Sequence, residues 1–557
     1  MRFGKFISRK LLGQFARTRY VRLIREACKS MNPDSEKEAL SDAYDILIAL
    51  SQEESEFIEI VVTMVEILDE KDPLSSAFLC HILELSALPS IRTSLKINIK
   101  LIQKISEKNL FRSSLKRRYR INAAVVWSVL AERLAGKVSE KMFTPEVFAS
   151  LTDGLKETQG WRVQLMSLIA LEKFALTADN KSKILVSGVP GIIKELPFAG
   201  VQSKFRNKDV RKLDELKLCT LWAIKCSFVD KTVSLHSEAE KRYSTEPNVT
   251  LNWLDATTCL KWYPSGLEVR NDSTSFESVR GTMCITQGSW FYEVQLVTSG
   301  IMQIGWATKQ SIFRPEEGVG VGDDDHSFAF DGCRKLAWSS GYPIPYGRGD
   351  AWKEGDILGA YIDMNCGIIR FYLNGVNLGI AFEFTESQLE HFVNDEGGFY
   401  PALSLTSFQH ISMNFGQKPF RYPPSMPFEN FDAKGKLPEA LRQRDVFYRP
   451  NALDTLSQEY EASLDGLNCS ICFDGVPTVE FEPCGHDGFC AKCASVLENC
   501  PLCRTHITLR RPFDFSLSSN VVMDLEVNAI ESNEAKSLIT TVHSLITCET
   551  LRGIPQS

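Results

Sequence analysis

Apolar side chains recur at helical spacing from residue 35 to about residue 230, as in "FIEIVVTMVEIL" at 57–68. Several such runs follow a polar residue suited to cap a helix. The predicted starts are the capping boxes Ser35/Glu38 and Ser51/Glu54 and the N-caps Asp72-Pro73 and Thr144-Pro145. The pattern predicts an all-α domain over 35–245. Its short loops favour a helical-repeat, armadillo-like arrangement, although no fixed sequence period recurs.

Near residue 250 the period changes to two, which is typical of strands. In "SWFYEVQLVTSG" at 289–300, one face of the predicted strand carries Trp290, Tyr292, Val294 and Leu296. The run "GIIRFYLNGVNLGIAF" at 367–382 predicts a hairpin about Asn374-Gly375, because both residues tolerate positive φ. Short strands of this kind continue to about residue 430 and predict an antiparallel β-sandwich over 250–430.

Three further segments have their own character. Residues 1–34 carry nine Lys/Arg and one Glu within the first thirty residues, without the apolar core of a secretory signal. They predict a basic first helix; an amphipathic helix that targets mitochondria or lies on a membrane surface is the alternative. Residues 431–466 are polar and predict a linker with a helical piece around 452–467. The tail, 508–557, has enough apolar residues to pack somewhere.

Composition excludes some classes of protein. At 557 residues the chain is too long for one hydrophobic core, and 44% apolar with 24% charged residues is ordinary for a folded protein. A net charge of −7 argues against a nucleic-acid binder. No apolar run reaches the length of a transmembrane segment. Most cysteines outside one cluster stand singly, which indicates a reducing compartment, so we expect a cytoplasmic protein.

Seven of the sixteen cysteines lie between 469 and 503, in the pattern C-x2-C-x11-C-x-H-x3-C-x2-C-x6-C-x2-C. Eight thiolate and imidazole ligands suffice for two four-coordinate zinc sites. The spacing leaves two arrangements open. Consecutive pairs could share an ion, or the pairs could interleave, so that the first and third bind one ion and the second and fourth bind the other.

The predicted sandwich resembles a SPRY domain in "GSWFYEVQLVTSGIMQIGWAT", "DGCRKLAW", "YLNG" and "NFG". This resemblance implies that loops at one end of the sandwich bind peptides or protein surfaces. In addition, "LIALEKFALTADNK" and "GQKPFRYPPSM" are similar to stretches of the family whose members contain both a RING finger and a SPRY domain. The chain departs from that family at both ends.

Two long loops, 314–328 and 339–352, are the candidate recognition loops of the sandwich. The first is acidic; it is predicted to be a solvated loop and a candidate contact for a basic partner. In the second, Tyr342, Tyr346 and Trp352 suit anchors in a partner's groove. The alternative is that Trp352 belongs to the core and both tyrosines are ordinary loop residues.

The cysteine cluster resembles a RING finger over 467–507. The resemblance implies the interleaved cross-brace, with Cys469, Cys472, Cys490 and Cys493 on one zinc and Cys484, His486, Cys500 and Cys503 on the other. It also implies a groove for a ubiquitin-conjugating enzyme. The matching groove residues are Ile471, Leu497 and Pro501, and Arg504 matches the arginine that bridges conjugating enzyme and ubiquitin. "CASVLENCPLCR" is similar to the RINGs of inhibitor-of-apoptosis proteins, which commonly dimerise, so a RING-mediated homodimer is a further expectation.

These resemblances predict a RING-type ubiquitin-protein ligase with two structural zinc ions and no covalent ubiquitin intermediate. The RING would orient a ubiquitin-loaded conjugating enzyme, and the SPRY loops would recruit an unidentified protein substrate. A covalent mechanism would need another reactive cysteine downstream, and Cys548 lies in no such motif. The alternative function is a non-catalytic adaptor whose zinc module only docks partners.

Overall fold

The computed structural model describes residues 18–29, 31, 37–107, 113–199, 210–228, 247–263, 265–438 and 441, and then 469, 471, 479–482, 486–498, 507 and 509–512. The chain divides into two units, Met1–Glu459 and Tyr460–Ser557. Each unit is described by itself. In the described part of the chain, no helix combines the length and apolarity that a membrane crossing needs.

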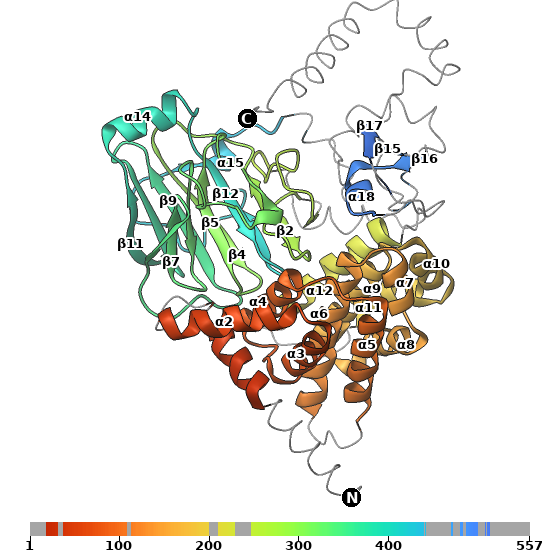
Figure 1. Cartoon of the computed structure of the whole chain (residues 1–557). Coiled ribbons are helices and arrows are strands. Elements are labelled where there is room, and N and C mark those ends of the chain that lie inside the picture. The colour runs from red at the N-terminus through yellow and green to blue at the C-terminus, as the bar shows by residue number, and fades with distance from the viewer. Residues whose placement is uncertain are drawn as a thin grey trace, which may run out of the picture. The chain divides into compact units, whose positions relative to one another are not determined.

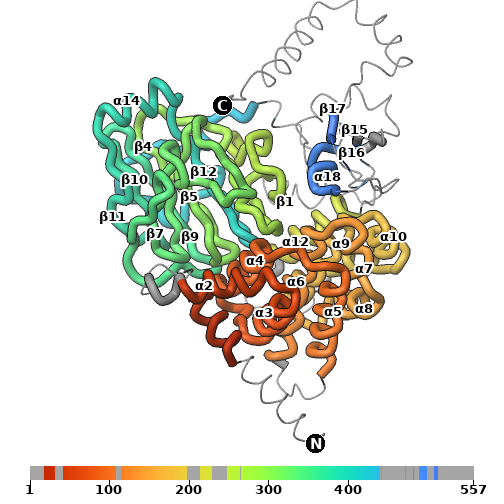
Figure 2. Tube along the Cα trace, in the orientation of Figure 1, coloured from red at the N-terminus to blue at the C-terminus, as the bar shows by residue number. Residues whose placement is uncertain are grey.

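The first part of the larger unit is all α, as predicted (Figure 1). Residues 18–29 are helical. The helices that follow are α2 (Lys37–Ser51), α3 (Glu54–Ile67), α4 (Pro73–Leu85), α5 (Ile91–Ser106), α6 (Ser113–Arg133), α7 (Lys137–Met142), α8 (Pro145–Gly154), α9 (Trp161–Phe174), α10 (Ala178–Val186), α11 (Val189–Ala199) and α12 (Val210–Trp222). Figure 2 follows this path, in which α6 packs against α3, α4, α5 and α9.

Two of the predicted helix starts are confirmed and one is wrong. Asp72 accepts a hydrogen bond from the Leu74 amide (3.1 Å), and Thr144 caps α8 in the same way. Ser51, by contrast, is the last residue of α2, where its hydroxyl donates to the Ile48 carbonyl (2.7 Å). Because that hydroxyl is used in the preceding helix, α3 begins at Glu54 without a side-chain cap. Ser35 lies outside the described residues.

The helical half is held together by an apolar core and by buried amides. Trp127 on α6 is buried, and its indole donates to the Asn98 side chain (3.0 Å). The helix at 18–29 joins this core through Tyr20, Ile24 and Ala27, which are buried. The described part of the basic N-terminal segment is therefore a packed helix of this half.

The predicted antiparallel sandwich is confirmed (Figure 1). One sheet has the strand order β1-β2-β13-β4-β9-β10-β11, with β14 beside β4, and the other has the order β3-β12-β5-β6-β7-β8. The strands are β1 (Leu260–Trp262), β2 (Glu268–Asn271), β3 (Glu277–Arg280), β4 (Ser289–Leu296), β5 (Met302–Ala307), β6 (Ser327–Asp331), β7 (Leu336–Ser339), β8 (Tyr342–Pro345), β9 (Ile357–Asp363), β10 (Ile368–Leu373), β11 (Val376–Glu383), β12 (Tyr400–Leu405), β13 (His410–Asn414) and β14 (Glu429–Asn430). Two helices accompany them, α14 (Glu386–Asn394) and α15 (Phe431–Lys434).

Strand β4 shows how the alternating pattern builds the sandwich. Its four predicted inward residues all lie in the core between the sheets, as expected. On its other face Phe291 is also buried, because Phe420 and Phe428 cover it. Phe431, which the sequence assigned to the linker, is fully buried against Trp290. The sandwich therefore continues past residue 430, while the helical piece predicted around 452–467 lies outside the described residues.

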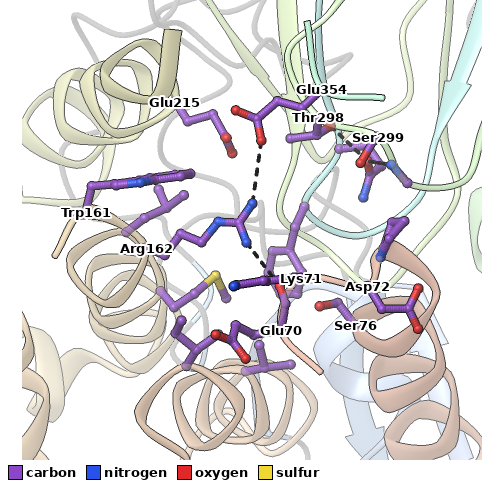
Figure 3. A pocket seen from close by; sticks show the side chains of 18 of the residues that line it. Glu70, Lys71, Asp72, Ser76, Trp161, Arg162, Glu215, Thr298, Ser299 and Glu354 are labelled. Carbon is purple, nitrogen blue, oxygen red and sulfur yellow. Dashed lines mark hydrogen bonds and ion pairs between the residues drawn. The ribbon is translucent and has the colours of Figure 1, made fainter. Parts of the chain in front are cut away.

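The two ends of the sandwich differ in what they contact. The helix-facing end, formed by residues 297–301, 346–356 and 406–409, meets the helical half at a cavity of about 110 Å³. Figure 3 shows Arg162 of α9 in this cavity, between the Glu354 carboxylate (3.6 Å) and the Glu70 carbonyl (3.3 Å). The distal end comprises 308–326, 340–341 and the segment around α14.

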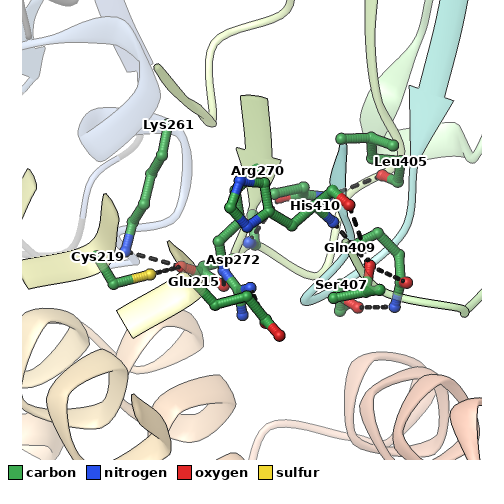
Figure 4. A network of polar contacts seen from close by, with 12 residues as sticks. Glu215, Cys219, Lys261, Arg270, Asp272, Leu405, Ser407, Gln409 and His410 are labelled. Atoms are coloured by element: carbon green, nitrogen blue, oxygen red, sulfur yellow. Dashed lines mark hydrogen bonds and ion pairs between the residues drawn. The ribbon is translucent and has the colours of Figure 1, made fainter. Parts of the chain in front are cut away.

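A buried network of charges joins the helical half to strands β1 and β2 (Figure 4). Lys261 contacts both Glu172 of α9 (2.6 Å) and Asp272 (2.8 Å). Arg270 contacts Asp272 (2.7 Å) and also Glu215 of α12. All five side chains are buried. Each buried charge contacts an opposite charge, which offsets the cost of removing it from water. Glu172 and Glu215 come from the helical half, so the full set of ion pairs forms only when both halves are in place.

Candidate zinc and recognition sites

The described residues of the smaller unit form a small sheet and a short helix. Strands β16 (His486–Phe489), β15 (Val479–Glu482) and β17 (Leu509–Pro512) pair in that order, and α18 (Ala491–Ser495) follows β16. Among these described residues, Val479, Phe481, Phe489, Ala494 and Ile507 form a buried apolar cluster, and the two phenylalanine rings stack at 4.7 Å. A core of this size is too small to stabilise a fold without further help.

That help is available from a cluster of cysteines. The sulfur atoms of Cys469, Cys490 and Cys493 lie within 4.8 Å of one another, and Cys469 is fully buried. Thiolates about 2.3 Å from a tetrahedral zinc lie about 3.8 Å apart, so the three sulfurs are close enough to share one ion. Cys490 also accepts a hydrogen bond from the Cys493 amide (3.4 Å), which orients it at the start of α18. The donor set suits zinc.

The identity of these three cysteines bears on the two ligand arrangements that the spacing left open, consecutive pairs on one zinc or interleaved pairs. Cys469 belongs to the first cysteine pair, and Cys490 and Cys493 form the third. Their proximity favours the interleaved arrangement over the consecutive one, which would place Cys469 with Cys484 and His486. The backbone of His486 lies in β16. The remaining predicted ligands, Cys472, Cys484, Cys500 and Cys503, lie outside the described residues.

Two of the predicted groove residues pack against the same apolar core of this unit. Ile471 and Leu497 are both half-buried and both pack against the small apolar core. They can therefore present apolar atoms to a partner from a common support. Pro501 and Arg504 lie outside the described residues.

Arg510 of β17 is a residue of this unit that no sequence motif indicated. Its Nε donates to the Ala494 carbonyl (2.8 Å), and its Nη2 donates to the Leu497 carbonyl. Both acceptors lie at the end of α18, beside the predicted groove. No motif in the sequence distinguishes Arg510 from the adjacent Arg511, and only the fold brings one of them to the helix.

The predicted SPRY anchors have three different environments. Tyr342 is 74% exposed on β8. The Tyr346 hydroxyl donates to the Gly379 carbonyl (2.8 Å) and accepts from the Phe371 amide (3.2 Å), and burial raises its pKa to about 12. Trp352 is 3% exposed, and its indole donates to the Gly300 carbonyl (3.2 Å). The structure thus places Trp352 in the core, the alternative weighed for it, and leaves Tyr342 accessible.

Part of the charge in the acidic loop is used within the loop itself. The Asp324 carboxylate accepts hydrogen bonds from the Ser327 hydroxyl (2.6 Å) and from the Ile312 amide (3.1 Å). Asp323 accepts from the Gly320 amide (2.8 Å), and burial raises the pKa of its carboxyl. These aspartates shape the loop, whereas Ile312, just before the loop, is 64% exposed.

Two family models match the chain. The SPRY domain model matches residues 289–418, and the model of the C3HC4-type zinc finger (RING finger) matches residues 465–510. The chain is 46% identical over 148 residues to "E3 ubiquitin-protein ligase RKP" of Arabidopsis thaliana. That match spans 27% of this chain and only 11% of the relative's length.

Solved SPRY structures also match. The SPRY domain of human HERC1 is 14% identical with a TM-score of 0.25, covering 30% of this chain and 99% of that structure. The TRIM65 PSpry domain is 17% identical with a TM-score of 0.23, covering 33% and 99%. The chain contains a SPRY domain and a C3HC4-type RING finger, and the cysteine cluster at Cys469, Cys490 and Cys493 lies within the RING match.

Proposed function

We propose that this protein is a RING-type ubiquitin-protein ligase that recruits its substrate through the SPRY half of the chain. The observation that carries the proposal is the cysteine cluster, in which Cys469 meets Cys490 and Cys493 from a distant pair inside the RING match. The 46% identity of part of the chain to a plant ubiquitin ligase supports it.

Two zinc ions would hold the RING fold. Cys469, Cys472, Cys490 and Cys493 would bind the first, and Cys484, His486, Cys500 and Cys503 would bind the second. Each ion would have four protein ligands and no open position, so it would stabilise the fold and take no part in the reaction. Zinc of this kind contributes roughly 10–16 kcal/mol in small peptides, which is enough to compensate for the small core.

The chain's own contribution to catalysis would be orientation. Ile471, Leu497 and Pro501 would bind the ubiquitin-conjugating enzyme, and Arg504 would donate hydrogen bonds that hold the attached ubiquitin in a reactive position. A substrate lysine would then attack the thioester between ubiquitin and the conjugating enzyme. Holding the reactants in this way lowers the barrier without a nucleophile on the ligase.

Autoubiquitination with a panel of conjugating enzymes tests the ligase. We expect the wild type to form chains with at least one of them, and Ile471→Ala to lose most of that activity with its zinc content unchanged. Arg504→Ala should slow ubiquitin discharge more than it weakens binding of the unloaded enzyme, and Arg504→Lys should not restore the rate, since lysine lacks the planar fork. The matched control is Lys492→Ala on the exposed side of α18. If no enzyme in the panel gives chains while the protein binds two zinc ions, the adaptor alternative replaces this proposal.

Substrate recruitment would use the distal end of the sandwich. The helix-facing end is packed against the helical half, whereas Tyr342 and Ile312 at or near the distal end are 74% and 64% exposed. Exposed aromatic side chains on a rigid framework are frequent anchors in protein interfaces.

Co-purification of partners tests this surface. Tyr342→Ala combined with Ile312→Ser should remove partners while autoubiquitination persists. Val376→Ser is the matched control, because Val376 is 61% exposed but lies on β11, next to the turn that begins at Asn374. If the double variant kept the same partners, recognition would have to use another surface of the chain.

A further inference from the structure

The end of helix α18 is held by an arginine of strand β17. Helix α18 has only five residues, and the last carbonyls of any helix lack partners within the helix. A helix this short has little stability of its own. Arg510 supplies two donors, with Nε on the Ala494 carbonyl at 2.8 Å and Nη2 on the Leu497 carbonyl.

The position of Arg510 is itself fixed by the sheet. In the register of β15 with β17, Arg510 lies opposite Phe481, whose ring is fully buried in the small core. The guanidinium therefore connects the sheet to the end of α18. Its two acceptors stand three residues apart, and the second belongs to Leu497, whose side chain packs on the same core as Ile471.

We propose that Arg510 is a positioning residue for the conjugating-enzyme groove: it holds residues 494–497 against the sheet and so keeps Leu497 packed on the core that also supports Ile471. This inference rests on the proposed ligase function. A planar guanidinium can reach two carbonyls at once, whereas a lysine ammonium in its place would reach one. Arg510 would act through Leu497 and would not itself touch ubiquitin.

The kinetic test uses the full chain with Arg510→Ala, Arg510→Lys and the control Lys492→Ala. Lys492→Ala also removes one positive charge near the end of the unit's helix, but Lys492 lies on the exposed side of α18. Ubiquitin discharge is measured against the concentration of loaded conjugating enzyme. We expect Arg510→Ala to raise KM about tenfold with kcat within about twofold, since a hydrogen bond from a charged donor contributes roughly that factor. Arg510→Lys should restore part of the loss, and Lys492→Ala should match the wild type. An unchanged KM in Arg510→Ala would overturn the inference.

A second measurement does not depend on ligase activity. Amide hydrogen exchange over residues 494–498 should be faster in Arg510→Ala, while exchange in β15 and the zinc content by native mass spectrometry stay as in the wild type. Unchanged exchange over 494–498 would overturn the inference even if KM rose. Loss of zinc from both Arg510 variants would show a folding role instead and would also overturn it. If the wild type itself discharges no ubiquitin, the proposed function fails, and the exchange result still decides whether Arg510 holds the segment.

Discussion

Lys261 has a buried ammonium group between two carboxylates, and its charge state follows from that position. Burial alone would lower the pKa of Lys261, but Asp272 and Glu172 raise it above its ordinary value. Burial likewise opposes the charge on Asp272, yet Arg270 and Lys261 together hold its pKa far below its usual range. Lys261 and Asp272 are therefore both ionised at neutral pH, while burial raises the pKa of the Glu172 carboxyl. No local sequence pattern indicates this network, because Lys261 lies 89 residues from Glu172 and Arg270 lies 55 residues from Glu215.

Removing one charge from this network tests whether its ion pairs stabilise the larger unit. Lys261→Met removes the positive charge that contacts both Asp272 and Glu172, and it leaves these two side chains buried. We therefore expect the free energy of unfolding of the larger unit to fall by about 3–5 kcal/mol. Urea unfolding followed by circular dichroism measures it. Lys353→Met is the control, because Lys353 pairs with Asp350 on the exposed surface. Equal stability of the two variants would contradict a structural role for the buried charges.

The depressed pKa of Asp272 predicts a specific pH dependence. A carboxyl whose pKa is lower in the folded state than in the unfolded chain stabilises the fold at pH values above the unfolded pKa, about 3.9. That contribution is lost as the pH falls through the folded value. We therefore expect the stability difference between the wild type and Asp272→Asn to be constant from pH 7 to pH 5 and to shrink below about pH 4. A stability difference that grew as the pH fell would contradict an ionised Asp272 in the folded protein.

At the scale of elements, the β10–β11 hairpin shows what a local sequence can specify. Asn374 and Gly375 adopt φ values of 50° and 82°, as the turn prediction requires. The Asn374 side chain also accepts a hydrogen bond from the Ile357 amide (2.9 Å), which ties the turn to β9. The turn could be predicted because its backbone preference is local. The burial of both faces of β4 could not, because Phe420 and Phe428 arrive from more than a hundred residues downstream.

Gly375 in that hairpin and Gly349 in the segment before β9 have the same φ, so comparing them separates backbone strain from crowding. Gly375 and Gly349 both have φ of 82°, but a Cβ on Gly375 would come within 3.3 Å of Tyr422, whereas none of the atoms around Gly349 lies within 4 Å of such a Cβ. Alanine costs roughly 1–2 kcal/mol at either position because of the left-handed backbone. We expect Gly375→Ala to destabilise by about 1 kcal/mol more than Gly349→Ala in urea unfolding, owing to overpacking. Equal losses would mean that Tyr422 moves aside freely.

The RING module shows the same division between local and tertiary information. The ligand spacing alone predicted zinc, and the RING resemblance predicted that Cys469 would meet Cys490 and Cys493, which the structure brings together. Arg510 was missed because its role depends on β17 returning beside β15.

At the scale of the whole molecule, zinc is expected to matter for one unit and not for the other. The described thiolate cluster belongs to the smaller unit, while the larger unit has its own extensive apolar cores. We expect a strong chelator to abolish hydrogen-exchange protection of β15 and β16 and to leave that of β4 unchanged. Added zinc should restore the protection. Loss of protection in β4 would show that the larger unit also depends on the metal.

The larger unit should unfold as one cooperative body, because its helical half and its sandwich share the buried charges of Lys261, Arg270 and Asp272. If the helices unfolded alone, these charges on the sandwich would lose Glu172 and Glu215, and Phe408 would lose its contacts with the helical core. Trp127→Ala, a cavity mutation in α6, should cost about 3–5 kcal/mol.

Under conditions in which exchange reports global opening, that mutation should accelerate amide exchange in β4 of the sandwich as much as in α6 itself. The control is Leu88→Ala in the helical half, because Leu88 is 60% exposed and its truncation leaves no cavity. Mass spectrometry of peptides from both halves gives the two rates in one experiment. If Trp127→Ala accelerated exchange in α6 while β4 kept its wild-type rate, the sandwich would be folding independently. The buried network would then only dock two separately stable parts. Equal acceleration of exchange in α6 and β4 is therefore the result that would support a single cooperative unit.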